Sequence, residues 1–200
     1  MSLEHLIAGG APAAMEWGLI IPIAIGALVV LWAVGAYNAL VRRRNHVDES
    51  WADIETELKR RYNLIPNLVE TVKGYAKHES ETLESVIAAR NAAASPHSSP
   101  EAQAKDENIL SGALRQLFAV AEAYPDLKAN TNFLELQQEL ANTEDRIQRS
   151  RRFYNANVRD LNTRIEVFPS NVIAGMFGFD QREYFEIEDD AQREAPKVDF

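Results

Sequence analysis

The pattern of apolar and polar positions begins with an uninterrupted apolar stretch near the N-terminus. Residues 17–37 carry no charged side chain. A helix of about 20 residues spans the hydrocarbon core of a bilayer, which is about 30 Å thick. Trp17, Trp32 and Tyr37 lie at or near the two ends of the stretch, as aromatic side chains do at membrane surfaces. We therefore predict a transmembrane helix over residues 17–37, after a short non-cytoplasmic tail at 1–16.

The charges on either side of the apolar stretch predict its orientation. Arg42, Arg43 and Arg44 follow it, whereas residues 1–16 contain acidic side chains and no Lys or Arg. Because positive charge is retained on the cytoplasmic side, the N-terminus should lie outside and the C-terminal body in the cytoplasm. A cleaved signal peptide normally has a basic start, which is absent here, although the small residues at 33–36 leave cleavage open as an alternative.

Beyond residue 37, apolar side chains recur at alternating spacings of three and four, which predicts helices packed along one seam. The first seam runs from Tyr37 to Val86 and passes Pro66 without a change of register. Pro66 is therefore either a kink in one long helix or the first residue of a new one. A second seam predicts a long last helix over residues 131–166, after a break at Pro125. Strand periodicity is absent, so we predict an all-α, coiled-coil-like helical bundle over residues 38–166, with kinks at Pro66 and Pro125.

Four charged residues fall on these apolar seams, namely Arg61, Glu79, Glu144 and Arg151. A lone buried charge is costly, so each of them should have a partner. One interpretation is a catalytic or ion-binding site. The interpretation we favour is a set of charge pairs that fixes the register of the helices, because this is the best-attested use of buried polar seam residues.

A second uncharged apolar segment follows the last helix, with the sequence FPSNVIAGMFGF over residues 168–179. An antiparallel bundle returns this segment to the end at which the first helix leaves the membrane. It should therefore lie in the membrane interface, cap the end of the bundle or pack on a second copy. We assign residues 167–185 as an interfacial or docking segment and residues 186–200 as an acidic, flexible tail. The residues of the 167–185 segment that we expect to contact the membrane or a second copy are Phe168, Ile173, Met176, Phe177 and Phe179.

Composition removes several classes of function. The chain has no cysteine, which excludes disulfides and thiolate chemistry, and its net charge of -9 argues against nucleic-acid binding. Its four histidines show neither an HExxH motif nor paired ligand spacing, and no phosphate-binding glycine loop occurs. We therefore expect no catalytic residues, no metal site and no cofactor.

Three long phrases, RRYNLIPNLVETVKGYAKHE, EAYPDLKAN and RRFYNANVRDLN, resemble the LemA family. The resemblance covers roughly residues 37–92 and 110–185. It implies a bacterial membrane protein with one span and an antiparallel body of four helices, which favours a new helix or a sharp bend at Pro66. The family brings no established reaction, and it is associated with membrane-protein quality control.

Together these features predict a non-enzymatic scaffold or adaptor of the bacterial inner (cytoplasmic) membrane. A lone span with small residues at Ala24, Gly26 and Ala27 can pack against copies of itself, so we expect a homo-oligomer. The expected partners are the lipid bilayer and, by family association, a membrane protease or other quality-control protein. The alternative is a metal- or charge-dependent membrane enzyme or a direct regulator of a membrane protease.

Overall fold

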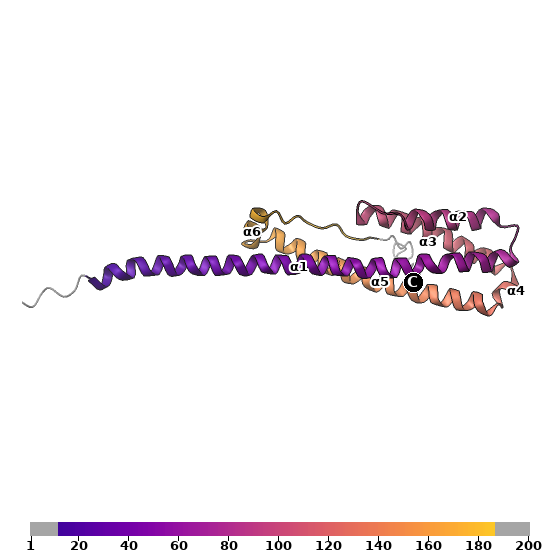
Figure 1. The fold of residues 1–200 in the computed structure, drawn as a ribbon, viewed down its shortest axis with the longest axis horizontal. Coiled ribbons are helices and arrows are strands. Elements are labelled where there is room, and N and C mark those ends of the chain that lie inside the picture. Colours follow the sequence, from indigo (N-terminus) through magenta and orange to yellow (C-terminus); the bar gives the residue numbers. More distant parts are fainter. Residues whose placement is uncertain (1–11, 187–200) are drawn as a thin grey trace, which may run out of the picture.

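The computed structural model describes residues 12–186, with side chains from residue 20 onward. Within that range the only regular secondary structure is helical, which confirms the predicted all-α class (Figure 1). The helices are α1 (Pro12–Tyr75), α2 (Ser80–Ala93), α3 (Pro100–Glu122), α4 (Pro125–Lys128), α5 (Thr131–Glu166) and α6 (Ser170–Phe177). Helix α5 has the bounds predicted for the long last helix of the bundle. The 1–16 tail falls mostly, and the acidic tail almost wholly, outside the described residues.

The first helix, α1, runs unbroken through 64 residues, about 96 Å at 1.5 Å per residue. Among the described residues, α1 is the one helix that is long and apolar enough to cross a membrane, and an 18-residue window in its N-terminal part has a mean hydropathy of 2.3. None of the residues in that 18-residue apolar window is buried inside the described structure. From Leu40 onward the same helix supplies buried seam residues to the core of the bundle.

Of the two alternatives left open at Pro66, the structure excludes a new helix, because Pro66 lies inside α1. Proline has no backbone N–H, so the carbonyl of Tyr62 loses its partner four residues ahead. The Arg90 Nε of α2 donates to that carbonyl oxygen at 3.1 Å and restores the missing bond. The chain instead reverses at residues 76–79, and Pro125 begins the short helix α4 rather than kinking a longer one.

The four longer helices of the body alternate in direction. The Asn130 side chain at the start of α5 donates to the Tyr75 hydroxyl at the end of α1 at 2.9 Å, whereas Asn157 near the end of α5 reaches the His46 carbonyl at 3.4 Å. Between them, α2 and α3 form a shorter hairpin that lies along the distal part of α1 (Figure 1). Two side chains cap the starts of helices, since Ser99 accepts from Ala102 N and Asn130 accepts from Phe133 N.

After α6 an extended strap, residues 179–186, runs back along the bundle (Figure 1). Asn162 exchanges two hydrogen bonds with the backbone of Arg182, and Asn155 does the same with Phe185, at 2.9–3.1 Å. The Phe185 ring is fully buried and packs edge-on against Trp51 at a centroid distance of 5.3 Å. The interfacial assignment of 167–185 is therefore wrong for the strap, because these side chains bind it to the body.

Candidate functional site

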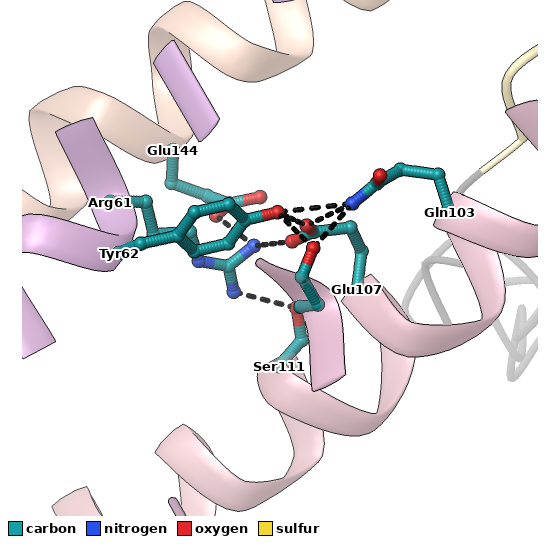
Figure 2. Close-up of polar contacts among 7 residues, drawn as sticks. Arg61, Tyr62, Gln103, Glu107, Ser111 and Glu144 are labelled. Atoms are coloured by element: carbon teal, nitrogen blue, oxygen red, sulfur yellow. Dashed lines mark hydrogen bonds and ion pairs between the residues drawn. The ribbon is translucent and has the colours of Figure 1, made fainter. Parts of the chain in front are cut away.

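The most deeply buried charges lie where α3 crosses α1 (Figure 2). The Arg61 guanidinium on α1 and the Glu107 carboxylate on α3 are 3.1 Å apart, at relative exposures of 3% and 0%. Two neighbours complete what we call the buried polar cluster, Arg61, Tyr62, Gln103 and Glu107. The Tyr62 hydroxyl donates to Glu107, and Gln103 Nε2 donates to the same Glu107 oxygen at 2.9 Å.

The cluster also has partners outside itself. Arg61 Nη2 donates to the Ser111 hydroxyl at 2.8 Å, and Arg61 Nη1 lies 3.5 Å from the Glu144 carboxylate on α5 (Figure 2). The Ala93 carbonyl, at the end of α2, accepts from Gln103 at 3.0 Å and lies 2.9 Å from the Tyr62 hydroxyl. A single arginine thus connects α1, α3 and α5, and the tyrosine adds α2.

Burial governs the protonation of this cluster. Loss of solvation raises the pKa of Glu107 above its usual range, and the neighbouring Arg61 opposes that rise only in part. Burial, together with the Glu107 charge, raises the pKa of Tyr62, so its phenol stays protonated and donates. Most donors and acceptors of the cluster satisfy one another, the exception among the described contacts being the buried Arg61 Nε, and such a network suits a device that fixes helix register.

A groove of about 470 Å³ opens beside the cluster, between the α2–α3 connection and the strap. Tyr62 and Gln103 reach it from the cluster, and Trp51 and Tyr154 line it with aromatic surface. Asp48 and Arg182 form an ion pair of 2.9 Å at its rim. No group of three or more His, Asp or Glu side chains suited to a metal ion occurs among residues 20–186.

The expectation that the seam charges have partners is confirmed for Arg61 and Glu144, which pair with each other. Glu79 lies in the turn before α2 rather than on a helix seam, and it accepts from the Tyr124 hydroxyl at 3.3 Å. Arg151 is half-buried on α5 and also has an interaction partner. Of the four, only Arg61 is fully buried.

The structure divides the predicted contact residues of the apolar segment. Ile173 and Phe179 are buried in the chain's own core, so their assignment as membrane or oligomer contacts is wrong. They belong to the inner side of α6, which packs on α1 and α5. Phe168, Met176 and Phe177 are exposed, as is Trp32 in the apolar stretch. Tyr37 is also exposed, at 36%, although its ring lies 4.8 Å from that of Phe177, and the Trp17 side chain falls outside the described side chains.

Sequence reasoning missed Glu107, Gln103 and the His97–Asp106 pair. Glu107 lies seven residues before Leu114 and therefore on the buried stripe of α3, a signal that could have identified it. His97 follows no such pattern. Its Nε2 lies 2.8 Å from Asp106 because the α2–α3 connection folds back over α3, and its side chain is only 10% exposed.

These features define a helical, membrane-associated protein whose apolar N-terminal helix continues into an antiparallel body. The sequence pattern of the LemA family matches residues 50–200, most of the chain. The chain therefore belongs to the LemA family, which confirms the resemblance drawn from its motifs.

Three relatives illustrate the range of similarity. Protein LemA of Metamycoplasma hominis is 30% identical over 70% of this chain and 64% of its own length. Magnetosome protein MamQ 2 of Paramagnetospirillum magneticum is 36% identical over 37% of this chain and 27% of its own length. Magnetosome protein MamQ of Magnetospirillum gryphiswaldense is 27% identical over 74% of this chain and 64% of its own length. The chain thus spans less than two thirds of each relative.

Proposed function

We propose that this protein is a non-enzymatic helical scaffold or adaptor, anchored in the bacterial inner membrane with its body in the cytoplasm. The observation that carries the proposal is the continuity of α1. One helix supplies both the exposed apolar stretch and the buried seam of the body, without a linker between them. A body joined to its anchor in this way is held at a fixed height and direction relative to the bilayer, which suits the presentation of a surface.

Self-association is the second part of the proposal. No residue of the apolar window of α1 is buried by the described part of the chain, which leaves this surface available to lipid or to another helix. Space is open around Gly26, where a second helix could approach closely. Confinement to the membrane plane raises the effective concentration of protomers, which favours assembly even when each contact is weak.

The proposed role of the buried polar cluster in fixing helix register supports the non-enzymatic part of the proposal. Glu107, the acid with a raised pKa, is fully buried and is engaged by an arginine, a tyrosine and a glutamine. A general acid or base must reach its substrate within hydrogen-bonding distance. The groove reaches the cluster through Tyr62 and Gln103, not through Glu107.

A more specific form of the proposal makes the scaffold an adaptor or regulator of a membrane protease in quality control. It rests on family association, with the groove between the α2–α3 connection and the strap as the surface such a partner could use. The photoreactive amino acid p-benzoylphenylalanine (Bpa) can be placed at Glu55, which lines this groove, and, as a matched comparison, at Glu84, which lies on α2 outside it. Crosslinks are then compared between the Glu55→Bpa and Glu84→Bpa variants. A protease adduct specific to the groove position supports this form, and its absence from both positions contradicts it.

Cysteine crosslinking tests self-association directly, because the natural chain contains no cysteine. Single variants at each position from Leu28 to Leu31 sample different sides of the exposed helix, since successive residues are about 100° apart. In native membranes we expect disulfide dimers to recur on one side and to be weak on the others. A uniform absence of dimers, with a monomeric mass in mild detergent, contradicts the scaffold. Stoichiometric metal in such a monomer would favour the enzyme alternative.

A further inference from the structure

We propose that the outer side of α6, with the Phe168 ring before it, is a membrane foot that inserts into the interfacial region of the leaflet from which α1 emerges. The inference deepens the proposed function and rests on its premise that the apolar stretch of α1 lies in a bilayer. We define the membrane foot as Phe168, Val172, Met176 and Phe177. Its ligand is the lipid surface itself.

The two sides of α6 differ sharply in their surroundings. Ser170, Ile173 and Ala174 are buried and hold the helix against the body. Phe168, Val172 and Met176 follow one another at intervals of four residues and are exposed to 81%, 50% and 72%. Gly178 has a φ of 66° and ends the helix, so that Phe179 turns back into the core. An apolar stripe is therefore presented outward by a helix that is firmly docked on its other side.

The height of the foot along α1 coincides with the end of the apolar stretch. The Tyr37 ring contacts the rings of Phe177 and Phe179 at centroid distances of 4.8 and 5.8 Å. Ala33 and Ala36, in the last turns of the stretch, pack against the core at this level. If residues 17–37 span the hydrocarbon, α6 lies where acyl chains meet headgroups, the depth at which short amphipathic segments bind.

Charge supports lipid rather than water or protein as the neighbour of the foot. Residues 167–179 contain no charged side chain, and Arg42, Arg43 and Arg44 lie on the next turns of α1. The Arg44 guanidinium lies 5.3 Å from the Phe179 ring centroid, which places a cation beside the foot where anionic headgroups would be.

Area also favours lipid over a second copy. The exposed parts of the four side chains amount to roughly 400 Å², given about 150–250 Å² for a whole aromatic side chain. A standard protein interface buries about 800 Å² on each partner. A bilayer sets no such minimum, because the span already holds the foot at its surface.

Depth-dependent fluorescence quenching tests the foot in the full chain. Three single variants, Met176→Cys, Leu31→Cys and Leu134→Cys, carry an NBD label in vesicles of three parts phosphatidylcholine to one part phosphatidylglycerol. Leu31 reports on the apolar stretch, and Leu134 is an exposed leucine at the distal end of α5. Quenchers are a nitroxide at the lipid headgroup, a nitroxide deep in the acyl chain and aqueous iodide. Phe168→Cys provides a second position in the foot, and circular dichroism checks that each variant keeps its helicity.

For labels at Met176 and Phe168 in the foot, we expect quenching by the headgroup nitroxide to be at least threefold greater than at Leu134. Quenching by iodide should be at least twofold weaker at these positions than at Leu134. Iodide access equal to that at Leu134, with Leu31 quenched from the acyl chain, overturns the foot while leaving the anchor intact. Protection from iodide without lipid quenching also overturns it and indicates a second copy. A Leu31 label that no lipid nitroxide quenches contradicts the anchor itself.

Discussion

Removal of one charge from the buried polar cluster should be far more damaging than removal of both. Arg61→Met leaves the Glu107 carboxylate in a site with no solvent exposure, and Glu107→Leu leaves the Arg61 guanidinium at 3% exposure. Breaking a buried pair from one side costs about 3–5 kcal/mol. The half-exposed Glu144 carboxylate, 3.5 Å from the guanidinium, should bring the cost of Glu107→Leu toward the lower end of that range.

The double variant Arg61→Met with Glu107→Leu should return to within about 1 kcal/mol of the natural protein, because neither charge then remains buried alone. The remaining polar groups keep partners in the structure. Gln103 Nε2 lies 3.0 Å from the Ala93 carbonyl, and the Tyr62 hydroxyl, 2.9 Å from the same oxygen, can donate its one proton there once Glu107 is replaced. Because each single substitution costs about 3 kcal/mol or more and the double about 1 kcal/mol or less, the coupling energy between them should be at least about 5 kcal/mol.

Urea unfolding of the full chain in mild detergent, followed by circular dichroism at 222 nm, measures all four free energies of unfolding. The matched control is the exposed pair Lys105–Glu101 on α3, 3.0 Å apart, for which the same cycle should give less than about 0.5 kcal/mol. If the substitutions at Arg61 and Glu107 were additive, the two charges would not be stabilising each other and the register role would be refuted.

Three further outcomes follow from local contacts. Arg90→Leu should lower the free energy of unfolding in urea by about 1–3 kcal/mol, because it leaves the Tyr62 carbonyl without a partner. Adding Pro66→Ala to the same chain should recover most of that loss, since alanine restores the helical N–H donor. Asn155→Ala should detach the strap around Phe185, seen as faster amide exchange there without loss of helicity; unchanged exchange would contradict its role. The raised pKa of Glu107 means that the folded state binds a proton more tightly than the unfolded state does. The stability of the natural protein relative to Glu107→Gln should therefore rise as the pH falls from the raised folded-state pKa toward about 4.5, and a difference that is independent of pH would contradict this.

The sequence predicts the helices well because their signals are local. The spacing of apolar residues places Leu40, Ile54 and Ile65 on one buried side, and Ser99 and Asn130 mark helix starts by the chemistry of their side chains. The reversal at residues 76–79 was not predicted, because the apolar register continues across it to Val86. The role of Pro66 was ambiguous for a related reason, since the donor that replaces its missing N–H comes from a different helix.

The candidate site is less predictable because its contacts are distant in sequence. Arg61 stood out as a charge on an apolar seam, but its partner Glu107 is 46 residues away and on a helix whose register the loop sequence does not fix. The strap shows the same limit. Phe185 ends the segment assigned as interfacial or docking, whereas the amide of Asn155, 30 residues earlier, holds its backbone against the body. Pairing of this kind depends on the tertiary arrangement, which periodicity alone does not encode.

The central claim, that α1 anchors a cytoplasmic body in the inner membrane, is tested most directly by sided thiol labelling. Lys73→Cys places one thiol at an exposed position near the distal end of α1, in a chain that otherwise has none. After an alkaline wash that strips peripheral proteins, a membrane-impermeant maleimide should label this thiol in inverted inner-membrane vesicles and not in intact spheroplasts. Labelling in intact spheroplasts, or release of the protein by the wash, would contradict the claim.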